Sequence, residues 1–299
     1  MSVQKPFLKW VGGKTQLMNT LIELIPSKMD NYYEPFVGGG SVLFAILSLQ
    51  KNNKITITEK IYANDVNEGL INTYKQIQTN AVKVYENLES SRNIYHSLDG
   101  TVINRSPNTV QESLTSKESY YYWIRKQFNE TSKDSIESAA FFIFLNKTGF
   151  RGMYREGPRG FNVPYGHYKK TPTMVTQAEL LYVQSLISNV VFSCTDFMNV
   201  MTNIGTDDFM YLDPPYAPEN AKSFVGYTSS GFDLEQHNVL FKRIRELSNS
   251  GVRFVMSNAK VDLVTNNFTG FEHIDIQAKR AINSKNPEAT TTEVIVFKM

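Results

Sequence analysis

The sequence lacks several features that would place it in a function class at once. Its one cysteine, Cys194, excludes an intrachain disulfide, and its four histidines are too scattered for a zinc site. The longest apolar run, residues 139–145, is too short to cross a bilayer, and no signal peptide is visible. The net charge of +2 does not by itself require a nucleic-acid partner. These absences predict a soluble protein of a reducing intracellular compartment (the cytoplasm or wherever the genome lies), with no membrane and no metal.

The order of the predicted elements indicates one α/β domain that a second module interrupts. Strand and helix patterns alternate up to about residue 66 and again from about residue 175 onward. Residues 67–174 are instead largely helical and polar, and they include a stretch rich in glycine, aromatic and basic residues at 146–172. Alternating strands and helices are typical of a doubly wound sheet. We therefore expect one domain built from residues 1–66 and 175–299, with residues 67–174 inserted in it as a recognition domain.

An apolar run at residues 209–212 ends in Asp213, two prolines and Tyr216. The run predicts a buried parallel strand, which the prolines end because they cannot donate to a sheet ladder. Ligands of open α/β sheets bind at the carboxyl ends of the strands. There a planar base can stack on Tyr216 while its exocyclic amine donates to the Asp213 side chain and the Pro214 carbonyl. The carboxylate would meet the positive charge that develops as the amine attacks an electrophile. A capped turn is the plain alternative.

Two glycine-containing stretches resemble nucleotide-binding loops. Residues 38–40 are three glycines before an apolar run, which predicts a tight strand-to-helix turn, and Asp65 follows the next predicted strand, where an acid can meet ribose hydroxyls. A packing turn and a helix cap are the plain alternatives. The dinucleotide pattern fails at Leu43, and the P-loop pattern that would end in Lys14 fails at Leu8. These failures disfavour enzymes that use NAD(P) or ATP.

Seven motifs, in order along nearly the whole chain, resemble those of the Dam-type DNA adenine-N6 methyltransferases of the alpha class: residues 7–14, 34–41, 64–67, 161–166, 213–216, 232–237 and 257–258. The resemblance implies a Rossmann-like, S-adenosylmethionine-dependent methyltransferase sheet with an inserted helical and hairpin DNA-recognition domain. It implies a site-specific enzyme that transfers a methyl group from S-adenosylmethionine to an adenine flipped out of double-stranded DNA. A solitary enzyme and the modification half of a restriction-modification pair both fit.

The resemblance also implies roles for individual residues. The catalytic residues that hold the target adenine would be Asp213, Pro214 and Tyr216. Those that bind the methyl donor would be Trp10 and Lys14 at its methionine end, Phe36, Gly38 and Gly40 beside it, Asp65 at its ribose, and Asp196 and Phe197 at its adenine.

DNA would be read by the N-terminal loop and the predicted hairpin, through Lys9, Phe150, Arg151, Met153, Arg155 and Pro164. In family members that read GATC, a lysine matching Lys9 contacts the first base pair, and hairpin side chains read the outer half of the site. Arg151 and Met153 depart from the commoner asparagine and leucine, whereas Arg155 is retained. We therefore expect GATC, with another short palindrome containing adenine as the alternative. Residues 279–284 are expected to touch phosphate.

Two other functions share some of these motifs. A methyltransferase for another planar amine, such as cytosine N4, RNA adenine or a glutamine side chain, could also use residues 213–216. The Dam-like residues 7–14 and the basic hairpin argue against it. A catalytically silent DNA-binding module is the second, and the intact Asp213, Pro214 and Tyr216 argue against that.

Overall fold

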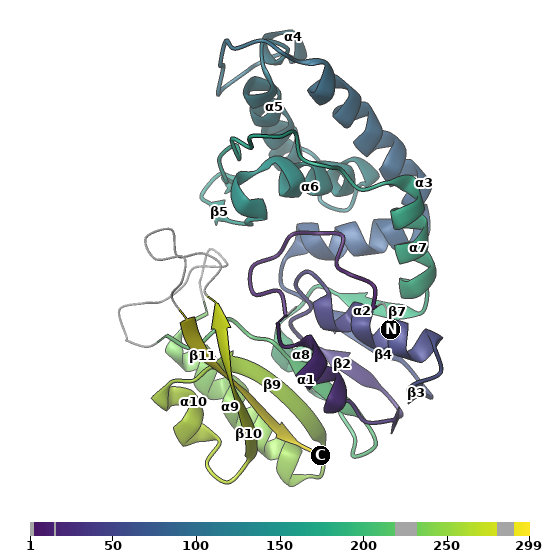
Figure 1. Cartoon of the computed structure of the whole chain (residues 1–299), viewed down its shortest axis with the longest axis vertical. Helices are drawn as coiled ribbons and strands as arrows, with labels where there is room; N and C mark the ends of the chain where they lie inside the picture. The colour runs from purple at the N-terminus through teal and green to yellow at the C-terminus, as the bar shows by residue number, and fades with distance from the viewer. Residues whose placement is uncertain (1–2, 15, 219–231, 280–289) are drawn as a thin grey trace. The chain divides into compact units, whose positions relative to one another are not determined.

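The chain divides into two units, shown in the computed structural model in Figure 1, which describes residues 3–14, 16–218, 232–279 and 290–299. The first unit comprises Met1–Gln4, Lys14–Val66 and Asn189–Met299, and the second comprises Lys5–Gly13 and Asn67–Ser188. These bounds differ from the expected ones at two places. The N-terminal loop and the segment after residue 174 both belong to the second unit, because they pack on its helices.

The first unit is built on a mixed sheet. Within the described residues its seven strands lie in the order β10-β11-β9-β8-β2-β4-β7. Four neighbouring pairs are parallel, whereas β11 runs antiparallel to both β9 and β10. The strands are β2 (Tyr32–Glu34), β4 (Ile61–Asn64), β7 (Val190–Ser193), β8 (Phe209–Leu212), β9 (Arg253–Ala259), β10 (Glu272–Lys279) and β11 (Thr290–Lys298).

The strand order places a topological switch point between β2 and β8. From β2 the chain moves to β4 on one side and later returns to β8 on the other side, so the connections leave these neighbouring strands in opposite directions. Ligands of doubly wound sheets bind in the crevice at such a point. The glycine turn follows β2 and Asp213 follows β8, so both stretches identified from the sequence lie at this edge.

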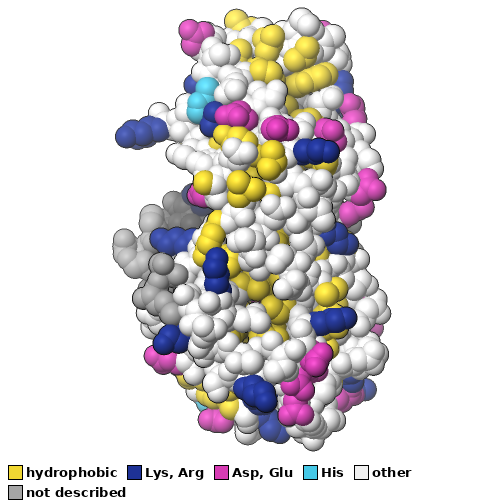
Figure 2. Space-filling model, turned by 90° about the vertical axis from the view of Figure 1, so that its right-hand side faces the viewer, with side chains coloured by type: hydrophobic (Ala, Val, Ile, Leu, Met, Phe, Trp, Pro, Cys, Tyr) yellow, Lys and Arg dark blue, Asp and Glu magenta, His cyan; other side chains and the backbone are white. Residues whose placement is uncertain are grey.

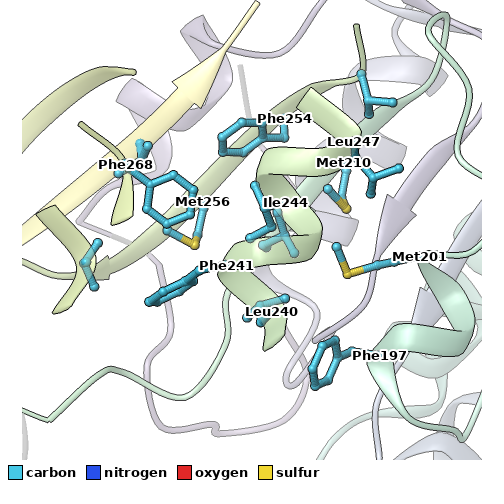
Figure 3. Close-up of a cluster of buried hydrophobic side chains, with 14 of the residues drawn as sticks. Phe197, Met201, Met210, Leu240, Phe241, Ile244, Leu247, Phe254, Met256 and Phe268 are labelled. Carbon is cyan, nitrogen blue, oxygen red and sulfur yellow. The ribbon is translucent and has the colours of Figure 1, made fainter. Parts of the chain in front are cut away.

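Helices cover both faces of this sheet (Figure 1). On one face, Met210 of β8 and Met256 of β9 pack against Leu240 and Ile244 of α9 (Figure 3). Residues 240, 241, 244 and 247 form the apolar stripe of α9, which has the spacing of a half-buried amphipathic helix. The helices are α1 (Met18–Glu23), α2 (Ser41–Lys51), α8 (Phe197–Val200), α9 (Leu234–Asn249) and α10 (Asp262–Asn267); β1 (Lys28–Met29) and β3 (Thr56–Ile57) form a separate small sheet.

The second unit is mainly helical. The long helix α3 packs on α6 and α7, and α5 packs on α6. Side chains of Ser116, Ser135 and Thr176 cap the starts of α5, α6 and α7. The elements are α3 (Glu68–Ser97), α4 (Val110–Ser113), α5 (Lys117–Glu130), α6 (Ile136–Thr148), the 3-10 turn η1 (Phe150–Gly152), β5 (Glu156–Gly157), β6 (Gly160–Phe161) and α7 (Gln177–Ile187).

Two further properties bear on partners. No helix among the described residues is long and apolar enough to cross a membrane. On the face drawn in Figure 2, lysine and arginine side chains are scattered among acidic ones, in keeping with the net charge of +2. On that face the basic side chains form no single large patch.

Candidate active site

The turn that follows β8 is the centre of the candidate site. All four residues of β8 are buried, and the strand ends at Leu212. Pro214 and Pro215 follow Asp213, and since neither proline has an N–H the ladder cannot continue. The side chain of Asp213 is 22% exposed, so a carboxylate with limited access to solvent stands at the carboxyl end of a central strand.

The Asp213 carboxylate is held from two sides. Lys14 Nζ lies 2.8 Å from its Oδ1, and the Lys14 side chain is only 3% exposed. Ser257 Oγ, on β9, donates to the same oxygen at 3.2 Å, and the Tyr211 hydroxyl lies 2.8 Å from Ser257 Oγ. The family resemblance implied that Lys14 lies at the methionine end of the donor. In this structure Lys14 pairs with Asp213, the carboxylate expected to hold the target base.

The rest of the turn is anchored to β11 and β9. The Tyr216 hydroxyl donates to Glu293 Oε2 at 2.7 Å, and Lys14 Nζ lies 5.0 Å from the centre of the Tyr216 ring. The next residue, Ala217, donates its N–H to Asn258 Oδ1 at 2.9 Å. These bonds fix the ring and the end of the turn, so its residues are positioned before any substrate binds.

The two proline carbonyls of the turn have different surroundings. His237 of α9 places its Nε2 3.0 Å from the Pro215 oxygen, while its Nδ1 lies 2.7 Å from the Asp233 oxygen. Among the residues that the structure describes, none donates a hydrogen bond to the Pro214 oxygen. The Pro214 carbonyl and the Asp213 carboxylate are therefore the acceptors that the turn offers to a substrate amine.

Burial dominates the electrostatics of the turn. Desolvation raises the pKa of Asp213, while Lys14 and the Ser257 hydrogen bond act in the opposite direction. Burial also raises the pKa of Glu34, at the end of β2, well above its usual range. The pKa of the Tyr216 hydroxyl is raised by burial and then by Asp213 and Glu293, so this side chain stays neutral and donates to Glu293. Lys14, and after it the Ser257 hydrogen bond, thus favour the ionised form of Asp213.

The glycine turn after β2 fits a bound cofactor. Gly38 has φ of 47° and Gly40 has φ of 74°, a conformation that side chains with a Cβ rarely adopt. Gly40 is also the N-cap of α2, so the turn leads directly into a helix N-terminus. The Gly38 N–H donates to Asp65 Oδ2 at 3.0 Å, which joins the turn to the acid that follows β4. A backbone open to close approach and a carboxylate for hydroxyl groups are thus adjacent.

Three aromatic rings form a cluster in the same unit. The Phe36 ring centre lies 5.4 Å from that of Phe197 and 5.9 Å from that of Phe232, and the last two rings are 5.8 Å apart. Asp196 caps α8 by accepting from the Met198 N–H at 2.9 Å, which places Phe197 at the first position of α8. Flat apolar rings of this kind suit the adenine of a nucleoside cofactor.

Trp10, expected beside the methyl donor, belongs to the second unit. Its ring stacks 6.3 Å from Phe142 and 6.2 Å from Tyr154. The other seven residues expected to bind the donor, and all three expected to hold the target base, belong to the first unit.

Lys9 is held by Asn146 within the second unit. Its N–H donates to Asn146 Oδ1 at 2.9 Å, and Asn146 Nδ2 donates back to the Lys9 carbonyl at 2.7 Å. Lys9 Nζ donates to the Lys147 carbonyl and the Tyr168 hydroxyl, both at 3.4 Å. Gly152, with φ of 67°, approaches so closely that a Cβ there would lie 2.5 Å from the Lys9 Cβ. The N-terminal loop is thus joined to the start of the predicted hairpin.

The other residues expected to read DNA lie around that hairpin. Arg155 Nε donates to Asn162 Oδ1 at 2.7 Å across the short β5–β6 ladder, and its side chain is exposed. Phe150 is 43% exposed, and the adjacent Arg151 has φ of 56°, an uncommon conformation for a residue other than glycine. Met153 is partly exposed, and Pro164 is exposed, with its carbonyl accepting the Phe150 N–H at 2.9 Å. Of the segment expected to touch phosphate, residues 280–284 lie outside the described residues.

Comparison with known proteins identifies the chemistry of this site. The family of D12 class N6 adenine-specific DNA methyltransferases matches residues 10–282. The chain belongs to this family. Among its relatives, the type II methyltransferase M.MjaIII of Methanocaldococcus jannaschii is 36% identical over 291 residues, which cover 94% of this chain and 93% of that protein. The type II methyltransferase M1.LlaDCHI of Lactococcus lactis subsp. cremoris is 30% identical (98% and 94% covered), and the DNA adenine methylase of Escherichia coli K12 is 29% identical (95% and 91%).

The chain is thus an adenine-N6 DNA methyltransferase, and its family uses S-adenosylmethionine as methyl donor. The predicted family and the predicted α/β methyltransferase fold are confirmed. Sequence reasoning missed four residues that hold the catalytic turn of this methyltransferase: His237, Ser257, Asn258 and Glu293. The first three stand inside motifs that carried the resemblance, which was the available signal, whereas nothing marked Glu293.

Proposed function

We propose that this methyltransferase modifies a flipped adenine in a short duplex site, GATC, using the turn at residues 213–216. The observation that carries the proposal is the anchoring of that turn, which leaves the Asp213 carboxylate and the Pro214 carbonyl as acceptors beside the Tyr216 ring. An exocyclic amine has two hydrogens to donate, and these two acceptors match them. A base within a duplex cannot reach such a turn, so it has to be flipped.

The chain's own residues would act on the amine by orientation and charge. The N6 lone pair of adenine is delocalised into the ring and is a poor nucleophile. Donation of both N6 hydrogens, to Asp213 Oδ and the Pro214 oxygen, favours a tetrahedral nitrogen with its lone pair directed outward. The Asp213 carboxylate meets the positive charge that develops on N6, and because it is already in place it needs no reorganisation. The ring of Tyr216 stacks on the base and keeps it oriented.

The methyl donor would be held by residues of the first unit: Lys14, Phe36, Gly38, Gly40, Asp65, Asp196 and Phe197. Trp10 is the eighth residue that the family resemblance assigns to the donor. When bound, S-adenosylmethionine supplies an electrophilic methyl group on a sulfonium that is already a good leaving group. The positive φ of Gly38 and Gly40, the Asp65 carboxylate beside them and the ring cluster around Phe36 support this assignment.

The second unit would read the DNA. Lys9 would contact the first base pair, Arg155 a guanine of the outer half, and Met153 and Pro164 would pack on base edges. Phe150 and Arg151 would enter the duplex near the flipped base, which suits an exposed ring on a strained turn. The division of the chain into two units supports separate catalytic and recognition domains.

The proposal is tested by incubating the protein and labelled S-adenosylmethionine with duplexes that contain GATC or single-base variants of it, and mapping the modified base. Label on the adenine of GATC alone is the expected result. Transfer to another adenine-containing palindrome would overturn the proposed site while leaving the family assignment intact. Label on cytosine or only on RNA would contradict the proposed use of the turn.

Arg155→Ala should relax discrimination at one outer base pair. Loss of a bidentate guanine contact should reduce the free-energy difference between the correct and a wrong base pair there by about 1–3 kcal/mol. The measurement is kcat/KM on the four duplexes that differ at that position. Arg159→Ala is the matched control, because Arg159 is an exposed hairpin arginine to which no base contact is assigned. Equal weakening on all four duplexes would make Arg155 a phosphate contact instead.

Asp65→Ala should weaken S-adenosylmethionine binding. The variant loses a charged acceptor for the donor's ribose and the bond to Gly38, and hydrogen bonds to charged groups contribute roughly 1.5–3 kcal/mol, or about 10- to 100-fold in Kd. Calorimetric titration of the donor without DNA measures this. Thr58→Ala is the control: it is another side chain of the first unit, and its hydroxyl bonds Asp30, away from the glycine turn. An unchanged Kd for Asp65→Ala would remove Asp65 from the donor site.

A further inference from the structure

His237 is a fully buried histidine for which the proposed reaction has no use. It lies near the start of α9 with no exposed surface. The centre of its ring lies 4.6 Å from that of Phe232 and 5.8 Å from that of Phe241. Each of its two ring nitrogens faces a backbone carbonyl oxygen, that of Pro215 at 3.0 Å and that of Asp233 at 2.7 Å. A carbonyl oxygen only accepts hydrogen bonds, so either contact is a hydrogen bond only if that ring nitrogen carries a proton. The Asp233 oxygen also accepts the backbone N–H of His237 at 3.1 Å, so it has a donor without the ring. A hydrogen bond to the Pro215 oxygen requires an Nε2–H.

The contact between His237 and Pro215 lies at the part of the turn that the other hydrogen bonds of the described residues leave unanchored. The first residue of the turn is fixed by Lys14 and Ser257 on Asp213, and its end is fixed by Asn258 on the Ala217 N–H. Neither proline between them has an N–H, so only their carbonyls can be held. The His237 bond holds the second of the two and fixes the middle of the turn.

Two adjacent carbonyls could compete for a substrate amine. The Pro215 oxygen lies 3.0 Å from His237 Nε2 and accepts from it when that nitrogen carries a proton, whereas no residue that the structure describes donates to the Pro214 oxygen. Which carbonyl is presented decides whether the amine can bridge a carbonyl and the Asp213 carboxylate. The residue that binds the Pro215 oxygen therefore acts on substrate orientation without touching the substrate.

We propose that His237 is a positioning residue for methyl transfer, which ties the Pro215 carbonyl to α9 through Nε2–H and leaves the Pro214 carbonyl to accept from adenine N6. This inference rests on the proposed function of residues 213–216. The alternative is a histidine that contributes only to core stability. The positioning role requires a proton on Nε2. It also requires kcat to fall in a variant that lacks this donor when the variants are compared at equal free energy of unfolding.

Nuclear magnetic resonance of the protein labelled with ¹⁵N-histidine and with proline that carries ¹³C at its carbonyl tests the bond without any turnover. The chain has four histidines, and the signal that disappears in His237→Gln belongs to His237. We expect Nε2 to carry a slowly exchanging proton that is coupled across the hydrogen bond to the carbonyl of Pro215. An Nε2 without a proton would overturn the proposal, because it could not donate to a carbonyl. This result does not depend on whether the turn acts on adenine, so it separates failure of this inference from failure of the proposed function.

Kinetics of paired variants test the positioning role. His237→Leu keeps an apolar side chain but has no donor, and we expect kcat to fall about 100-fold, the scale of an ångström-sized misplacement, with little change in donor Kd or in KM for DNA. His237→Gln has an amide that can donate to Pro215, and should recover most of kcat. Leu240→Ala is the control, since Leu240 is a buried residue of the same helix with no polar contact to the turn.

The outcomes are distinguished after the variants are compared at equal free energy of unfolding, which denaturant adjusts. A loss of kcat confined to His237→Leu, with rescue in His237→Gln, is the expected result. Equal loss in Leu240→Ala and His237→Leu, or no rescue by glutamine, would leave His237 with a structural role only and overturn the proposal.

Discussion

Asp213→Ala should lower kcat at least about 1,000-fold while S-adenosylmethionine still binds. The substitution removes one of the two proposed acceptors for the N6 hydrogens, and with it the carboxylate proposed to meet the positive charge that develops on N6. Donor affinity is assigned mainly to the glycine turn, Asp65 and the ring cluster, which the substitution does not touch. Single-turnover methylation of a GATC duplex measures the rate, and calorimetric titration measures donor binding.

Asp213→Asn separates two contributions of Asp213, because asparagine keeps a hydrogen-bond acceptor but loses the negative charge. In the wild type Lys14 and Ser257 both bond Oδ1 of Asp213. The amide oxygen of asparagine can accept from the same two groups, so the geometry of the turn is retained. We expect an intermediate rate, above that of alanine and below that of the wild type, because a neutral acceptor stabilises a cationic nitrogen less well. Near-normal turnover of Asp213→Ala would refute the catalytic role, and loss of donor binding would show that the turn also supports the donor site.

The local signals in the sequence were enough to predict the strand β8, and they also mark the start of α7. Residues 209–212 are all apolar and two prolines follow, so both ends of β8 were predicted. The start of α7 follows from Thr176 and Glu179, which form a capping box that can be recognised from spacing alone. In each case the feature that ends the element lies within a few residues of it.

Elements that depend on distant partners could not be delimited. The adjacent strands β3 and β4 belong to different sheets: β3 pairs with β1 in a small sheet, while β4 pairs with β2 and β7 in the main one. Helix α3 runs for 30 residues through polar sequence, with a non-helical residue at Asn80. Its buried residues face α6 and α7, and only that packing makes it one element.

The partners of the catalytic turn lay beyond sequence reasoning for the same reason. Glu293 bonds Tyr216 because β11 lies between β10 and β9 in the sheet, in antiparallel register with Glu293 opposite Ala259. Nothing near Glu293 in the chain encodes that register. The pairing of Lys14 with Asp213 likewise depends on where the segment before α1 lies in the folded unit. Residue types at the site were predictable, whereas which of them hold one another was not.

Lys14→Met should move the acid limb of the kcat–pH profile to higher pH. The ionised form of Asp213 is the one that stabilises the reacting amine, so kcat falls as the pH drops through the pKa of Asp213. Burial raises that pKa and Lys14 lowers it, and without Lys14 the pKa rises further. Because Lys14 is also proposed to contact the donor, the measurement is single-turnover rate at saturating S-adenosylmethionine across a pH series.

Because the pKa of Asp213 rises in Lys14→Met, the free energy of unfolding should also depend on pH differently in this variant. A carboxyl whose pKa is raised in the folded state binds more protons there than in the unfolded state, so the free energy of unfolding falls as the pH rises through the interval between the two pKa values. In Lys14→Met this interval widens. The variant should match the wild type closely at low pH, where Asp213 is protonated in both, and lose about 3 kcal/mol at high pH, where a buried carboxylate lacks its cation. Denaturant titrations at several pH values measure this difference.

Glu293→Gln provides a control of opposite sign. The charge of Glu293 raises the pKa of Asp213, whereas glutamine keeps an acceptor for the Tyr216 hydroxyl without that charge. Its acid limb should therefore move to lower pH while the ring of Tyr216 stays anchored. If both variants shifted the limb in the same direction, the titration would belong to a group other than Asp213. If neither shifted it, the limb would reflect a step other than methyl transfer, and Lys14 would serve the donor rather than the catalytic carboxylate.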